Sequence, residues 1–134
     1  MAFSLHGMYE QKEREFRAGG SPDTFQPDFL TAVNDCIGYV NVQCNLETEL
    51  AFATDESDTI DLDQEHQWVL SDGVSWRLLS MGYTRAGMKP GDLAAATAVM
   101  QQQFERGVPQ IKTRLHHTNQ ADTDNDVIGL GAVD

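Results

Sequence analysis

The chain has 134 residues and a formal net charge of −12, and its charge is unevenly distributed. No Lys or Arg lies between Ser21 and Trp76, where twelve carboxylates occur, while nine acidic and nine basic residues cancel elsewhere. A surface built from this stretch, the acidic segment, repels anions and excludes tight electrostatic binding of nucleic acid. The length predicts one domain, and no apolar run resembles a membrane span or a secretory signal.

Residues 1–26 are predicted to form an N-terminal arm. The charged stretch from Glu10 to Arg17 allows a helical turn or two, and Ala18-Gly19-Gly20-Ser21-Pro22 then breaks it. This composition supplies few apolar groups to offset the entropy lost on ordering. We therefore expect an extended arm that is mobile in the free protein and ordered in an assembly.

The first long helix is predicted over residues 27–44, at the start of a helical domain covering 27–116. Pro27 suits a first helical turn, and Asp28 favours a helix N-terminus. The two cysteines, eight residues apart on this helix, are too distant for a disulfide and indicate free thiols. The apolar residues follow a 3.6-residue period: Phe29, Leu30, Val33, Cys36, Ile37, Val40 and Cys44.

Residues 48–62 read as a β-hairpin. Polar and apolar side chains alternate on both sides of the turn-forming Thr54–Asp58. The expected apolar set is Leu50, Phe52, Ile60 and Leu62. Because an isolated hairpin is only marginally stable in water, it must pack against the helices or pair with another chain.

The second helix is predicted over residues 63–81 and is apolar on two sides. One stripe contains His66, Val69, Leu70, Gly73, Val74, Leu78 and Met81. The other contains Trp68, Trp76 and Leu79, which we predict to lie at a subunit interface. Arg77 between the tryptophans and Leu79 either pairs with a neighbour's carboxylates at this interface or forms an exposed ion pair that contributes little. Two alternatives stay open: the tryptophans belong to the core, or Asp72-Gly73 breaks the segment into strand, turn and helix.

The third helix is predicted over residues 91–116, with a kink at Pro109, which cannot donate a backbone hydrogen bond. Residues 117–134 are predicted to be a flexible C-terminal tail. Its apolar residues, Val127, Ile128, Leu130 and Val133, gather after an acidic spacer. This arrangement is typical of a docking peptide that adds to a neighbouring protein.

No catalytic constellation is apparent, so we expect no enzyme, no cofactor and no metal site. Asp122, Asp124 and Asp126 resemble the start of a calcium loop, but its sixth and twelfth positions are Val127 and Val133. The carboxylates near the predicted hairpin tip either gather a divalent ion or, more simply, are solvated. Four of them are candidates for an exposed acidic surface: Asp55, Glu56, Asp58 and Asp61.

Residues 60–79, IDLDQEHQWVLSDGVSWRLL, place a short acidic strand before a helix that ends in Arg-Leu-Leu. With the Gly-rich loop and basic-ended helix that follow, residues 27–116 resemble the head-completion, or adaptor, proteins of tailed bacteriophages. The resemblance implies a mainly α small bundle of three main helices with a β-hairpin and extended termini. It also implies a homo-oligomeric ring, possibly a dodecamer, made in the host cytoplasm and located at the virion neck.

In that family the ring contacts the portal protein and the tail or neck proteins, and double-stranded DNA passes through it. A channel wall without bases suits this role, because it forms no stable Lys or Arg contacts with phosphate that would hold the duplex. The resemblance therefore makes the four acidic candidates, Asp55, Glu56, Asp58 and Asp61, the residues expected to face the channel. The main rival is an acidic DNA mimic that inhibits a nucleic-acid-binding protein, and a third reading is an acidic regulatory or chaperone-like module. The DNA mimic explains the charge but not the second apolar helix face.

Overall fold

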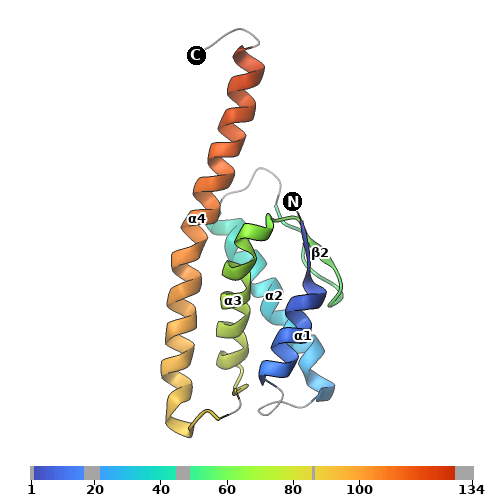
Figure 1. The fold of residues 1–134 in the computed structure, drawn as a ribbon, viewed down its shortest axis with the longest axis vertical. Helices are drawn as coiled ribbons and strands as arrows, with labels where there is room; N and C mark the ends of the chain where they lie inside the picture. The colour runs from blue at the N-terminus through green and yellow to red at the C-terminus, as the bar shows by residue number, and fades with distance from the viewer. Residues whose placement is uncertain (1, 17–21, 45–48, 86, 129–134) are drawn as a thin grey trace.

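The computed structural model describes residues 2–16, 22–44, 49–85 and 87–128. The chain is mainly helical with a small two-stranded antiparallel sheet, which confirms the predicted fold class (Figure 1). The elements in chain order are β1 (Phe3–Ser4), α1 (Leu5–Phe16), α2 (Pro22–Cys44), β2 (Thr59–Ile60), η2 (Gln64–His66), α3 (Gln67–Ser80), η3 (Pro90–Asp92) and α4 (Leu93–Ile128).

Helices α2, α3 and α4 correspond to the three predicted helices and form the centre of the fold. Helix α3 lies between α4 and the pair formed by α1 and α2 (Figure 1). Helix α3 continues through Asp72-Gly73, so the alternative break at this position is wrong. The predicted stripe of α2 is buried except for the partly buried Leu30. Apolar periodicity therefore located the main core correctly.

Two glycines allow the central helices to approach closely. A Cβ placed on Gly73 of α3 would lie 2.6 Å from both Cys36 Sγ and Phe104 Cδ1. A Cβ on Gly107 of α4 would lie 2.8 Å from Val69 Cγ2. Such distances are far inside van der Waals contact, so α3 packs against α2 and α4 at positions where only glycine fits.

The prediction of an extended N-terminal arm is wrong for the described part of residues 1–26. Residues 5–16 form α1, and α2 begins at Pro22. The inward face of α1 consists of Leu5, Met8, Lys12 and Phe16, all buried. These positions fall at helical spacing, but Lys12 interrupts the apolar stripe, and its buried alkyl stem takes the place of an aliphatic residue.

The antiparallel pair exists, but residues 48–62 do not form the predicted hairpin. Strand β2 pairs with β1 in the register Phe3↔Ile60 and Ser4↔Thr59. The amide of Leu5 continues this contact by donating to the carbonyl of Asp58 at 2.8 Å. The N-terminus therefore supplies the strand that the sequence analysis had assigned to residues before Asp55.

Residues 49–53 run along α2 instead, held by two asparagines two turns apart. Asn41 donates through Nδ2 to the carbonyl of Leu50 at 3.0 Å and accepts from its amide through Oδ1 at 2.8 Å. Asn34 binds Ala53 in the same two-sided way, at 2.9 and 2.7 Å. The side-chain amides thus satisfy backbone groups that a partner strand would otherwise satisfy. Leu50 is buried as predicted, but Phe52 is exposed.

Helix α4 continues through Pro109 to Ile128 and extends beyond the other helices (Figure 1). The predicted tail is therefore helical over 117–128. Val127 and Ile128 lie in the last helical turn, while Leu130 and Val133 lie outside the described residues. Within the described ranges, no helix has both the length and the apolar character needed to cross a membrane.

Candidate assembly surface

The acidic turn at residues 54–58 uses its carboxylates to shape its own backbone. Asp58 Oδ2 accepts from the amide of Thr54 at 2.8 Å, from that of Asp55 at 3.2 Å, and from the Thr54 hydroxyl at 3.2 Å. Asp55 accepts from the amide and hydroxyl of Ser57, and these hydrogen bonds lower the pKa of Asp55. Two predicted channel-facing residues, Asp55 and Asp58, therefore also have a structural role.

The other two acidic candidates differ from each other. Glu56 is partly buried and accepts a hydrogen bond of 2.9 Å from Gln26 Nε2 at the start of α2. Asp61 follows β2 and is exposed. Across the described part of the chain, no three His, Cys, Asp or Glu side chains come together in a way that suits a metal ion. The turn thus presents a negative surface fixed in shape by its own hydrogen bonds.

The four residues predicted at a subunit interface have different environments. Leu79 is 1% exposed within this one chain, so assigning it to an interface was wrong. Trp76 is partly buried, with its ring centroid 5.8 Å from that of Phe104. Arg77 lies 5.3 Å above the Trp76 ring and pairs with Asp35 of the same chain at 3.1 Å. Only Trp68 keeps a large apolar exposure.

An apolar patch that the sequence did not predict lies on α2 and is formed by Gly38 and Val42 of that helix and by Phe52, which folds over it. The Phe52 ring lies over Gly38, with its Cε1 3.8 Å from the position of a Cβ on that glycine. Val42 is one turn further along the same face of α2. Val42 is 74% exposed and Phe52 58%, so two large apolar side chains lie in solvent within an acidic region. The signal in the sequence was Val42, which lies off the α2 stripe.

A second exposed strip runs along the first half of α4. Residues 93–104 contain no charged residue, although the chain as a whole is strongly acidic. Val99 is 48% exposed, and Gln102 and Arg106 are exposed at positions i+3 and i+7 from it. These spacings place the three residues on one helix face. We call this set the α4 strip.

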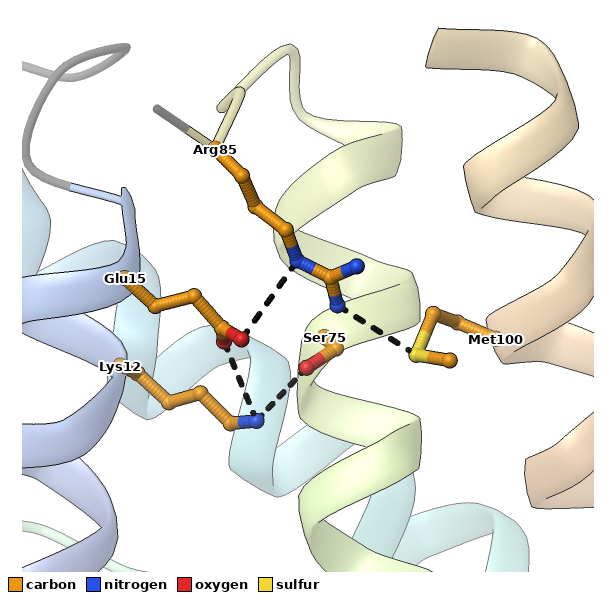
Figure 2. Close-up of polar contacts among 5 residues, drawn as sticks. All are labelled: Lys12, Glu15, Ser75, Arg85 and Met100. Carbon is orange, nitrogen blue, oxygen red and sulfur yellow. Dashed lines mark hydrogen bonds and ion pairs between the residues drawn. The ribbon is translucent and has the colours of Figure 1, made fainter. Parts of the chain in front are cut away.

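A buried polar cluster joins α1 to α3 and to the loop before α4 (Figure 2). Lys12 Nζ donates to Ser75 Oγ at 2.7 Å and lies 3.5 Å from Glu15 Oε1. The other oxygen of Glu15 lies 3.5 Å from Arg85 Nε, and Arg85 reaches Met100 Sδ at 3.5 Å. The cluster therefore connects elements that are about seventy residues apart in the chain.

The electrostatics of this cluster indicate a positioning role. Burial lowers the pKa of Lys12, with the carboxylate of Glu15 opposing the shift. Burial likewise raises the pKa of Asp72, against the influence of Lys12 and Arg85. A lysine beside a serine hydroxyl occurs in some hydrolases, but Lys12 is 4% exposed and Ser75 1%, so substrate has no direct access to either. We assign the cluster to holding α1 in place.

Comparison with known proteins identified no matching family model, no similar curated protein and no similar solved structure.

Proposed function

We propose that this protein is a structural adaptor that forms a ring at the head-to-tail junction of a tailed bacteriophage virion, below the portal. The ring extends the DNA channel, and its outer surfaces dock the portal and the tail or neck proteins. The observation that carries the proposal is the combination of a base-free acidic region with large exposed apolar side chains on the same part of the fold. Acidic charge keeps DNA mobile, and apolar groups mark protein contacts.

The arrangement of the acidic turn supports a channel role. Asp55 and Asp58 bond to the backbone of their own turn, so the turn holds its shape without a ligand. Exposed Asp61 lies beside it, after β2. A fixed negative surface of this kind repels the phosphate backbone at short range without binding it. DNA then moves through the channel without forming contacts to its phosphates that would have to be broken.

A DNA mimic remains the rival function, because the acidic segment favours it equally. A mimic needs carboxylates spaced to occupy an arginine-rich site and has no need of exposed apolar residues. Val42 and Phe52, which are 74% and 58% exposed, therefore favour an assembly protein. The two functions separate experimentally, since a mimic binds a nucleic-acid-binding protein and an adaptor binds a portal ring.

Electron microscopy of the purified protein, alone and mixed with the portal ring of the same virus, tests the proposal. We expect added density on the tail-facing side of the portal, with a continuous axial channel. A gel-shift assay with duplex DNA is expected to show no stable complex at physiological salt. Absence of portal binding, together with capture of a nuclease or transcription factor, would instead support the DNA mimic.

A further inference from the structure

The chain is electrostatically polarised along its length. The acidic segment has twelve carboxylates and no base, whereas residues 77–115 have six bases and only two acids. Two of these bases, Arg77 and Arg85, already pair with carboxylates of the same chain. Lys89 and Arg106 are exposed on the loop before α4 and on α4 itself. One part of the molecule is therefore complementary in charge to another part of a second copy.

The acidic side of this pair is the α2 patch. Gly38, Val42 and Phe52 form an exposed apolar surface. Glu49 is exposed and directly precedes Leu50, whose backbone is fixed to Asn41 of α2, the residue before Val42. No base occurs in residues 22–75, and the base that reaches this side of α2, Arg77 of α3, is paired with Asp35 at 3.1 Å.

The complementary side is the α4 strip. Val99 supplies an exposed apolar group, and Arg106 supplies a base two turns away. The nearest acid on this part of α4, Glu105, accepts a hydrogen bond from Gln101 at 3.1 Å, on the flank of the strip. The uncharged residues 99–104 allow close approach by an acidic surface.

We infer that a second copy of this chain docks its α4 strip onto the α2 patch. Val99 then packs against Phe52 and Val42, and Arg106 pairs with Glu49. The inference deepens the proposed function, on which it rests for the closure of the ring. Pairing the base-free region of one copy with the same region of another sets carboxylates against carboxylates, which is unfavourable.

In the proposed ring the contact is head-to-tail: each copy offers its α4 strip to one neighbour and its α2 patch to another. Residues 49–60 lie on the other side of α3 from α4 (Figure 1), whereas Gly38 and Val42 lie on the C-terminal half of α2, which contacts α4 through Tyr39 and Cys44. Contacts between unlike surfaces repeat from copy to copy and close into a ring when the rotation between copies permits it. A two-fold dimer would make the same contact twice between two copies, so the mass of the assembly separates it from a ring.

Charge reversal on each side tests the contact. We expect Arg106→Glu and Glu49→Lys each to weaken self-association at least about tenfold, measured by light scattering over a concentration series. Mixing the two single variants is expected to restore assembly, because each interface then again contains one base and one acid. Controls of matched charge are Arg14→Glu and Glu10→Lys, both exposed on α1, and thermal melting by circular dichroism verifies folding.

The outcomes separate this contact from the proposed function. Restoration in the mixture, with neither single variant assembling, supports the contact whether or not the protein binds a portal. A wild-type chain that stays monomeric, or single variants that assemble like the controls, overturns the contact. Portal binding by those same variants would leave the proposed function standing without this contact.

Discussion

The central helices and the outer layer of this fold are held by different kinds of interaction. Helices α2, α3 and α4 meet through apolar side chains and through Gly73 and Gly107, where no Cβ fits. The outer layer, formed by α1, β1, β2 and residues 49–60, also buries apolar side chains such as Leu5, Met8 and Phe16, but it is further held by specific polar contacts. Asn34 and Asn41 hold the backbone of 49–53, and Lys12 joins α1 to Ser75.

This difference shows how a small acidic chain combines a closely packed centre with outer segments whose side chains can face solvent. Close apolar packing fixes the helices, so it tolerates little change in side-chain volume. Hydrogen bonds, which are directional, hold the backbone of the outer segments in place. Apolar side chains such as Phe52 therefore need not be buried to fix these segments, and they can face solvent. The outer layer thus contributes Phe52 to the candidate assembly surface, whose other residues lie on the central helices α2 and α4.

The largest expected effect comes from filling a glycine position in the centre. Gly73→Ala places a Cβ 2.6 Å from Cys36 Sγ and Phe104 Cδ1, so side chains or helices must move. We expect the free energy of unfolding to fall by about 1–3 kcal/mol, the range for overpacked cores. Urea denaturation followed by circular dichroism measures it.

Gly7→Ala is the matched control in the outer layer. A Cβ at Gly7 meets nothing within 4 Å, and the residue lies within α1. Because alanine favours the helix, we expect a gain of about 0.4–1 kcal/mol. Equal losses for both variants would show that the centre is not packed more tightly than the outer layer.

The second largest effect is expected from a substitution that removes one attachment of the outer layer. Asn41→Ala leaves the buried amide and carbonyl of Leu50 without the partner that the side chain provides. We expect a loss of about 1–3 kcal/mol, the cost of a buried unpaired polar group. Hydrogen exchange of the Leu50 amide should accelerate far more than that of α3. Unchanged exchange there would contradict the role of Asn41.

The sequence located the central helices because periodic apolar residues report helix packing directly, as with Val33, Ile37 and Val40. It misassigned residues 48–53 because their alternation resembles a strand, whereas their hydrogen-bond partners are side chains of Asn34 and Asn41. Propensity and alternation carry no information about such distant partners.

Similar reasons explain the other differences. Helix α1 was missed because Lys12 occupies a position of its buried stripe, which hid the spacing of Leu5, Met8 and Phe16. Leu79 was assigned to an interface because the sequence does not show how much of the surface of α3 the neighbouring helices bury within one chain. The α2 patch depends on how Phe52 folds back over Gly38, which only the structure reveals.

The smallest effect is the pH dependence due to Lys12. Its pKa is lowered by burial from 10.5, so in the alkaline range below that value the unfolded chain binds more protons than the folded chain. Stability from this group therefore rises with pH across that window. We expect Lys12→Met to change stability by less than about 1 kcal/mol at neutral pH and to flatten this rise.

Exposed Lys89 gives the control, since Lys89→Met should leave the alkaline slope unchanged. The slope is obtained from urea denaturation at a series of alkaline pH values. An identical slope for Lys12→Met and wild type would show that Lys12 is not held as a buried ammonium group in the folded protein.

The salt dependence of the wild-type oligomeric mass tests the central claim most directly. Complementary charge between the acidic α2 patch and the α4 strip weakens as salt screens it. Light scattering at fixed protein concentration is therefore expected to show assemblies at low salt and a falling mean mass as sodium chloride increases. A chain that is monomeric at low salt and associates only as salt rises would contradict the account, because repulsion between like-charged copies would then dominate.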